Sequence, residues 1–251
     1  MTAPSTATPF GFSPLVYGCS KLLVLAWARV WLRLSLQGCD RAPASGPLLA
    51  VGNHCSYLDP PLLGVAMPRP VQFLAQKGLA KFPPLRWWLR AAGVSLIDRS
   101  APSKDVLRFL ANALEAGACV SIFPEGTRSQ DGLVGPFRSG VEFLVRRTGA
   151  PVLPIGIDGT FRALPRGGKF PRPAKCVVRC GEVWPQERVL APGGIEALRR
   201  EIATLANAGL RTDDVQSPRV DQGRSPAPAD PAPSPSPSRP SPNPTSGGGR
   251  A

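Results

Sequence analysis

Hydrophobic residues in this chain fall in short apolar runs that are separated by longer stretches of mixed polarity. Apolar runs of about four to eight residues, bounded by glycine, proline or polar residues, predict buried strands. Apolar residues that recur every third or fourth position predict helices. The predicted strands are residues 48–52, 71–75, 94–97, 119–123, 152–157 and 176–181. The predicted helices are residues 60–66, 84–92, 103–116, 140–147 and 194–208.

The predicted strands and helices alternate along residues 37–212. This alternation is typical of an α/β fold, so we expect a mixed, largely parallel sheet flanked by helices in one domain. The remaining segment, residues 213–251, is rich in proline, serine, alanine and glycine and contains ten prolines. Such a segment has too little apolar bulk to offset its ordering entropy, so we predict a disordered tail.

Residues 1–36 form a third segment, which ends in a strongly apolar run. The run carries three basic residues: Lys21, Arg29 and Arg33. Spanning a bilayer takes about 20 apolar residues with few charges, so this run is a poor membrane span. On a helix, Trp27 and Trp31 would share one face and the two arginines another. This pattern predicts a helix that lies in the membrane interface, and an ordinary core helix is the alternative.

The chain has a formal net charge of +13, from 30 Lys and Arg against 17 Asp and Glu. After Thr212 there are four arginines and four aspartates, so the whole excess lies on residues 1–212. A basic domain favours an anionic partner: nucleic acid, an acidic lipid surface or a phosphorylated substrate. The basic residues are dispersed and match no nucleic-acid motif, so we do not expect nucleic acid as the partner.

Six cysteines are spread along the chain with spacings that match no zinc site. They are Cys19, Cys39, Cys55, Cys119, Cys176 and Cys180. Free cysteine packs as a small hydrophobic residue. We therefore predict buried structural thiols without a disulfide framework, as in a reducing compartment, and no metal site.

The single histidine, His54, directly follows a predicted strand, and Asp59 comes five residues later. Loops after strands are where α/β proteins bind ligands. If a helix begins near Asp59, its carboxylate can bond one imidazole nitrogen and raise the basicity of the other. That pair would form a general base for an alcohol. The alternative is a structural histidine beside an unrelated helix-capping aspartate.

A second motif, Phe123-Pro-Glu-Gly-Thr-Arg-Ser129, also follows a predicted strand. Gly126 permits a sharp loop, and Thr127 and Arg128 supply donors suited to a phosphate. Glu125 could order Arg128 or bind a substrate hydroxyl. The alternative is a surface turn. Motifs for a serine hydrolase of the nucleophile-elbow type and for a P-loop enzyme are absent from the sequence.

Two further segments accompany these motifs. The strand at residues 94–97 is followed by Asp98-Arg99, and Arg99 could join Arg128 around one anion. The apolar segment Val152-Leu-Pro-Ile-Gly-Ile157 has no polar chemistry. We interpret it as a strand that lines an acyl or pantetheine passage.

Taken in order, these segments resemble the 1-acyl-glycerol-3-phosphate acyltransferase family. The family's H-x4-D box matches His54 and Asp59. The matches to its other boxes are Ile97-Asp-Arg99, Phe123-Pro-Glu-Gly-Thr-Arg-Ser129 and Val152-Leu-Pro-Ile155. Phe137-Arg-Ser-Gly140 resembles a further F-K-x-G segment, with Arg138 in place of lysine. The resemblance covers residues 45–185.

The resemblance implies that His54, oriented by Asp59, deprotonates the free hydroxyl of a lysophospholipid. The oxygen then attacks the thioester of acyl-CoA or acyl-carrier protein without an acyl-enzyme intermediate. The same resemblance implies an acceptor-binding site, in which Lys77 is carried over although Gly78 replaces the family's usual glutamate. That site consists of Lys77, Arg99, Glu125, Gly126, Thr127 and Arg128.

The product implied by the resemblance is phosphatidic acid, formed from 1-acyl-glycerol 3-phosphate in phospholipid biosynthesis. No cofactor is implied beyond the acyl thioester. Alternatives are the same transfer to glycerol 3-phosphate or another lysolipid, or a non-catalytic peripheral protein that binds acidic lipid. We expect the chain to be membrane-associated, at the cytoplasmic face of a bacterial inner membrane.

Overall fold

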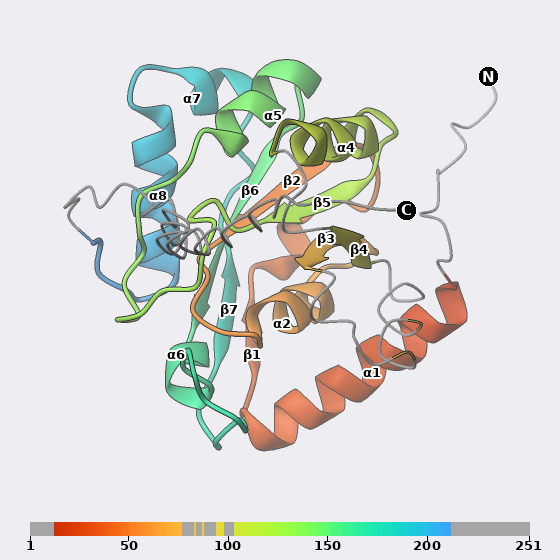
Figure 1. Cartoon of the computed structure of the whole chain (residues 1–251), viewed down its shortest axis with the longest axis vertical. Helices are drawn as coiled ribbons and strands as arrows, with labels where there is room; N and C mark the ends of the chain where they lie inside the picture. The colour runs from red at the N-terminus through yellow and green to blue at the C-terminus, as the bar shows by residue number, and fades with distance from the viewer. Residues whose placement is uncertain (1–12, 77–82, 84–86, 88–93, 98–102, 212–251) are drawn as a thin grey trace, which may run out of the picture. The chain divides into compact units, whose positions relative to one another are not determined.

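The computed structural model describes residues 13–76, 83, 87, 94–97 and 103–211 (Figure 1). Its strands are β1 (Ser35–Gln37), β2 (Leu48–Gly52), β3 (Val71–Gln76), β4 (Val94–Ile97), β5 (Cys119–Ile122), β6 (Val152–Asp158) and β7 (Val177–Cys180). Its α-helices are α1 (Pro14–Trp31), α2 (Asp59–Ala66), α4 (Ser103–Glu115), α5 (Gly140–Thr148), α6 (Thr160–Ala163), α7 (Gln186–Leu190) and α8 (Gly194–Leu205). A short 3-10 helix covers Cys39–Arg41.

The strands form one sheet in the order β1-β7-β6-β2-β5-β3-β4. The five strands from β6 to β4 run parallel to one another. β7 pairs antiparallel with β6, and β1 runs parallel to β7. The largely parallel sheet predicted from the sequence is therefore confirmed. The strand order places β2 between β5 and β6, so the loop after β2 lies between the loops that follow its two neighbours.

Helices cover both faces of the sheet, and alternate residues of the central strand show why. Leu48 and Ala50 of β2 pack on one face with α1 and α2. Leu49 and Val51 pack on the other face with α4, α5, α7 and α8 (Figure 1). Every residue of β2 is buried, as expected for a parallel strand between two helical layers. This strand is a rigid support for the loop that carries His54.

Gly156 of β6 allows the end of α8 to approach the sheet closely. A Cβ atom at this position would lie 2.2 Å from the main-chain nitrogen of Ala206. Only glycine fits there without moving the helix. The close approach brings the residues that follow α8 to the edge of the sheet where β2 and β6 end.

The predicted amino-terminal helix is present as α1, with Ser13 capping its first turn. Ala28 and Leu32 pack into the core, and Lys21 donates to the main-chain oxygen of Met67. The expected alignment of Arg29 with Arg33 is wrong. The helix ends at Trp31, and Arg33 has a φ of 43°, outside helical geometry. Among the described helices, none combines the length and apolarity needed to cross a bilayer.

The predicted elements within the described residues are present, with ends that differ by up to three residues. Four short elements without a clear apolar period were not predicted, namely β1, the 3-10 helix, α6 and α7. The predicted helix at 84–92 is largely outside the described residues, as is the tail from residue 212. The prediction of buried thiols is wrong for Cys19, which is exposed on α1, and incomplete for Cys39, which is half-buried.

Candidate active site

The candidate site lies where β2 and β5 end side by side at the same edge of the sheet. Val51 of β2 is paired with Ile122 of β5, so the loops that follow both strands emerge together. One loop carries His54 and leads into α2, which begins at Asp59. The other carries residues 123–129. Carboxyl ends of neighbouring parallel strands are the usual ligand-binding edge of α/β sheets.

His54 and Asp59 form the pair that their spacing predicted. Nδ1 of His54 lies 2.8 Å from Oδ2 of Asp59. The same oxygen accepts hydrogen bonds from the main-chain N–H groups of Cys55 at 2.6 Å and Ser56 at 2.7 Å. The Asp59 side chain is fully buried, in the first turn of α2, where the helix dipole favours a negative charge.

This geometry assigns the proton between the two side chains. Main-chain N–H groups only donate, so Oδ2 of Asp59 acts as an acceptor toward Cys55 and Ser56. A carboxylate that accepts from these donors also accepts from the imidazole, so Nδ1 of His54 carries the hydrogen. The lone pair is then on Nε2. The arrangement holds His54 in the tautomer that can remove a proton from a hydroxyl group.

The orientation of the imidazole is also fixed by an aromatic neighbour. The rings of His54 and Phe123 are stacked, with centroids 4.4 Å apart and an interplanar angle of 19°. The His54 side chain keeps 19% of its surface exposed, in contrast to the buried carboxylate behind it. One edge of the base therefore remains open to a substrate.

Glu125 joins the loops around the site through its two carboxylate oxygens. Oε1 accepts the main-chain N–H of His54 at 2.8 Å, and Oε2 accepts that of Gly135 at 3.0 Å. Burial raises the pKa of the Glu125 carboxyl, and the two N–H donors oppose this shift. Among the described residues, Glu125 thus accepts hydrogen bonds from main-chain N–H groups and forms none with Arg128.

Gly126 adopts a left-handed conformation, with a φ of 70°, and so provides the sharp loop that the sequence predicted. A Cβ atom there would lie 2.7 Å from Nε of Arg138. The guanidinium group of Arg138 therefore packs directly against the loop. Thr127 is exposed at the loop's surface. Gly126 and Arg138 are exposed as well, so the loop presents an accessible basic surface.

Arg128 rests on the ring of Tyr57, which belongs to the loop between His54 and Asp59. The guanidinium carbon lies 3.6 Å from the ring centroid, a cation–π contact. Nη1 of Arg128 is buried and has no hydrogen-bond partner among the described residues. A buried donor without a partner is costly, so this group is suited to receive an acceptor atom from a ligand.

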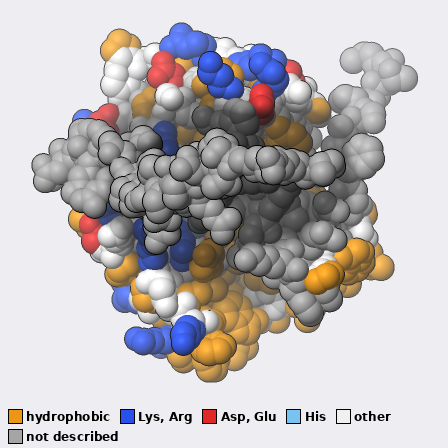
Figure 2. All heavy atoms as spheres, viewed as in Figure 1, with side chains coloured by type: hydrophobic (Ala, Val, Ile, Leu, Met, Phe, Trp, Pro, Cys, Tyr) orange, Lys and Arg blue, Asp and Glu red, His pale blue; other side chains and the backbone are white. Residues whose placement is uncertain are grey.

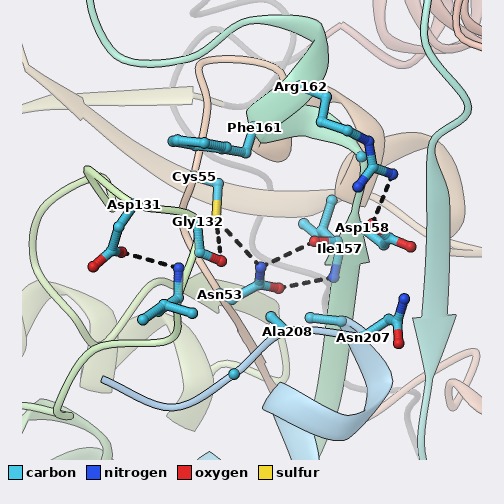
Figure 3. A pocket seen from close by; sticks show the side chains of 14 residues that line it. Asn53, Cys55, Asp131, Gly132, Ile157, Asp158, Phe161, Arg162, Asn207 and Ala208 are labelled. Atoms are coloured by element: carbon cyan, nitrogen blue, oxygen red, sulfur yellow. Dashed lines mark hydrogen bonds and ion pairs between the residues drawn. The ribbon is translucent and has the colours of Figure 1, made fainter. Parts of the chain in front are cut away.

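A pocket of about 240 Å³ lies beside the His54 loop (Figure 3). Asn53 and Cys55 form part of its wall, together with Asp131, Phe161 and Asn207. The side chain of Asn53 is fixed by two hydrogen bonds to the main chain of Ile157, which tie the end of β2 to β6. Burial raises the pKa of the Cys55 thiol to about 12, so this sulfur is a poor nucleophile at neutral pH.

Residues after α8 support the loop that Glu125 holds. Val134 forms a β-bridge with Leu210, and the buried Arg199 donates to the main-chain oxygens of Val134, at 3.1 Å, and Arg211. Arg211 in turn pairs with both carboxylate oxygens of Asp131. Gly135, the next residue after Val134, donates to Glu125. The main chain of His54 is therefore linked to the end of the domain.

Residues 33–158, half of the chain, match the family described as Acyltransferase. The chain belongs to the Acyltransferase family. The matched range includes the His54–Asp59 pair and the 123–129 loop.

Individual relatives of this Acyltransferase chain agree with the family match. A chloroplastic 1-acyl-sn-glycerol-3-phosphate acyltransferase of Brassica napus is 33% identical over 153 residues, which are 57% of this chain and 44% of that protein. A lyso-ornithine lipid O-acyltransferase of Pseudomonas aeruginosa is 33% identical over 113 residues, 45% of this chain and 43% of that protein. The chain thus spans about half the length of the curated relatives it matches.

A solved structure has a similar fold. The crystal structure of the 1-acyl-sn-glycerophosphate acyltransferase PlsC from Thermotoga maritima superposes with a TM-score of 0.66 and 25% sequence identity. The match covers 76% of this chain and 78% of that one. The α/β architecture is therefore that of an acyltransferase of this family.

Of the predicted site residues, the structure brings together His54, Asp59 and the Glu125–Arg128 loop. Lys77 and Arg99 lie outside the described residues. The packing partners Tyr57, Phe123 and Arg199 were not predicted from the sequence. Tyr57 and Phe123 lie inside the quoted motifs, so their position was a usable signal. Arg199 lies on α8, far along the chain, and its sequence context carries no such signal.

Proposed function

We propose that this chain transfers a fatty acyl group from a thioester to the free hydroxyl of 1-acyl-glycerol 3-phosphate, giving phosphatidic acid. The observation that carries the proposal is the hydrogen bond from Nδ1 of His54 to the buried Asp59 carboxylate, which leaves Nε2 as a base. The family membership and the names of the relatives support the same reaction class.

In the proposed reaction, Nε2 of His54 takes the proton of the acceptor hydroxyl as its oxygen attacks the thioester carbonyl carbon. A carbon–oxygen bond forms and the carbon–sulfur bond breaks. The sulfur leaves as a thiol after taking the proton from His54. Asp59 stabilises the imidazolium that forms in between, because its charge is held by three hydrogen bonds in a buried position.

The acceptor's phosphate is proposed to bind at Arg128, whose buried Nη1 has no partner among the residues described. A guanidinium group matches two phosphate oxygens at once. Gly126 and Thr127 would supply the loop's N–H and hydroxyl groups. Lys77 and Arg99 are proposed as further cations around the phosphate. Glu125 would hold the His54 loop through its two hydrogen bonds to main-chain N–H groups.

The proposed acyl donor is acyl-CoA or acyl-carrier protein. Acyl transfer from a thioester to a hydroxyl involves no change of oxidation state. It needs only one base, which accepts the proton of the hydroxyl and returns it to the sulfur. We therefore propose that the reaction needs no cofactor besides its acyl thioester.

The proposal is tested with the purified chain, lysophosphatidic acid and acyl-CoA, comparing wild type with His54→Gln. We expect the variant to lose roughly 10²- to 10⁴-fold in kcat, the usual contribution of a general base. Arg146→Gln, an exposed change on α5, is the control and should retain activity. Full activity in His54→Gln would contradict the mechanism. Acylation of other lysolipids, with none of lysophosphatidic acid, would contradict the proposed acceptor.

A lyso-ornithine lipid is a second candidate acceptor, because the Pseudomonas relative bears that activity in its name. This acceptor has no phosphate. Arg128→Gln separates the two, since it should raise KM for lysophosphatidic acid and leave KM for a phosphate-free acceptor nearly unchanged.

We also propose that α1 lies on a membrane surface, where a lysolipid acceptor resides, at the cytoplasmic face of a bacterial inner membrane. Its outward side is apolar and exposed, and its inner side packs on the domain. The exposed apolar residues are Leu15, Leu22, Leu23, Trp27, Val30 and Trp31. A helix with this layout suits an interface rather than water.

A further inference from the structure

The loop between α6 and β7, residues 165–173, concentrates positive charge at one place on the surface. From Gly159 to Gly181 the sequence has six basic residues and no acidic residue. Five of the six are exposed; Arg162 pairs with Asp158, and the other four are Arg166, Lys169, Arg172 and Lys175. None of these four forms an ion pair with the residues that the structure describes. Their charge is thus directed to solvent or to a partner.

Phe170 stands at the centre of this basic loop, with 82% of its surface exposed. A single exposed phenylalanine is ordinary on a protein surface. This one, however, is flanked by Lys169 on one side and by Pro171 and Arg172 on the other. An apolar side chain between exposed cations is the arrangement that lets a protein insert into a lipid interface while binding its phosphates.

The loop is held in shape by its own main chain and by α1. Gly168 donates to the main-chain oxygen of Pro165 at 2.9 Å, and Arg172 to that of Ala163 at 2.8 Å. Nε1 of Trp31 donates to the oxygen of Pro171 at 3.1 Å. A preformed loop avoids the ordering cost that a flexible loop would incur on binding. The loop also surrounds a hollow of about 360 Å³, lined by prolines, Phe170, Lys169 and Arg172.

The bond from Trp31 joins the basic loop to the exposed apolar side of α1. Trp31 closes that helix and is itself 43% exposed. Figure 2 shows hydrophobic side chains gathered at the lower edge of the molecule, with Lys and Arg side chains directly beside them. In Figure 1 the end of α1 and the segment after α6 lie at this same edge. The apolar and basic features therefore form one continuous surface.

We propose that the 165–173 loop is a second membrane contact, which binds the headgroups of anionic phospholipids and inserts Phe170 beside α1. The inference deepens the proposed function, because it rests on the proposed membrane location of α1. An acidic carrier protein could also meet the basic residues. It would not account for their continuity with six exposed apolar residues on α1, so the bilayer is the favoured partner.

The test is sedimentation of the full chain with phosphatidylcholine vesicles, prepared with and without phosphatidylglycerol. The test variants are Phe170→Ala and the double change Lys169→Glu with Arg172→Glu. A matched control, Arg146→Glu with Arg200→Glu, makes the same change in net charge at exposed sites on α5 and α8. Each cation near an anionic surface is worth about fivefold in affinity, so the double variant should lose at least about tenfold on phosphatidylglycerol vesicles.

We expect the control pair to bind these vesicles within about threefold of wild type, because distant charges are screened. Phe170→Ala should weaken binding several-fold. Acylation of a short-chain lysophosphatidic acid below its micelle concentration should be retained in both loop variants, since none of the three changed residues lies at the site. Loop-dependent binding by a chain that acylates no lysolipid would refute the proposed function and leave the loop proposal intact.

Unchanged vesicle binding by the double variant would overturn the loop proposal. The same holds if loop and control variants lose binding equally, since net charge alone would then explain it. Normal vesicle binding together with slower turnover of acyl-carrier protein, but not of acyl-CoA, would also overturn it and identify the loop as a dock for the acidic carrier.

Discussion

The main-chain N–H of His54 donates a 2.8 Å hydrogen bond to Oε1 of Glu125, across 71 positions of sequence. The position of His54, the proposed base, thus depends on a carboxylate from the loop after the neighbouring strand. The other oxygen of Glu125 holds Gly135. One buried side chain therefore sets the spacing between the His54 loop and the segment that follows the 123–129 loop.

Glu125→Gln should lower kcat by about 10- to 100-fold. The two oxygens of Glu125 accept from the N–H groups of His54 and Gly135, and the NH2 group of glutamine would replace one of these oxygens with a donor. One hydrogen bond is lost, and a base displaced by about 1 Å typically costs this much. Steady-state kinetics at saturating acceptor measure the effect. Glu142→Gln, on the exposed side of α5, is the control. A kcat within twofold of wild type would show that Glu125 does not position His54.

The effect of Glu125→Gln on the free energy of unfolding should depend on pH. Burial raises the pKa of Glu125 above its ordinary value of 4.5. A carboxyl with a raised folded-state pKa contributes stability at low pH, and this contribution is lost as the pH rises from 4.5 through the folded-state value. The free energy of unfolding of wild type minus that of Glu125→Gln should therefore fall over this window. Urea unfolding at a series of pH values measures it, and a difference that rises with pH would contradict the assignment.

Asp59→Asn should reduce kcat by roughly 10²- to 10⁴-fold with little change in KM, because the neutral amide cannot stabilise the His54 imidazolium. The helix and its first turn should persist, since an asparagine oxygen still accepts from Cys55 and Ser56. Circular dichroism checks the fold while kinetics measure the loss. A large rise in KM with normal kcat would argue for a role in binding instead.

Tyr57 should influence acceptor binding through Arg128, which lies 3.6 Å above its ring. Tyr57→Leu should raise KM for lysophosphatidic acid about two- to fivefold, the range of an exposed cation–π contact, whereas Tyr57→Phe should stay near wild type. Neither change should alter KM for the acyl donor. Equal effects of leucine and phenylalanine would point to the hydroxyl group rather than the ring face.

Arg199→Met should lower the free energy of unfolding by roughly 1–3 kcal/mol, because the main-chain oxygens of Val134 and Arg211 lose their buried donor. Arg200→Met, at the neighbouring exposed position, should change it by less than about 0.5 kcal/mol. Denaturant unfolding distinguishes them. If the two variants are equally stable, Arg199 does not support this segment.

The core strands could be predicted from the sequence because burial between two helical layers makes them continuously apolar. The run at 48–52 is the strongest example, and its ends are those of β2. The short β1 and α6 could not be found this way, since three or four residues show no period. The reversed direction of β7 also escaped prediction, because an apolar strand carries no sign of its orientation.

The His54–Asp59 contact could be predicted because both residues lie in one tight turn at the start of a helix. The roles of Glu125 and Arg199 could not. The expectation that Glu125 orders Arg128 or binds a substrate hydroxyl stays a prediction. The contacts that the motif did not predict are its hydrogen bonds to main-chain groups 71 and 10 residues away. Contacts of this range depend on the packing of whole elements, which motif spacing does not encode.

The β-bridge between Val134 and Leu210 limits when the contacts around the His54 loop can form during synthesis. The His54 loop leaves the ribosome early, yet the segment that braces it through Glu125 pairs with residues 209–211. During synthesis the His54 loop therefore lacks this support until the residues after α8 have been made. A nascent chain that ends before residue 209 contains every strand of the sheet but lacks the residues that pair with Val134.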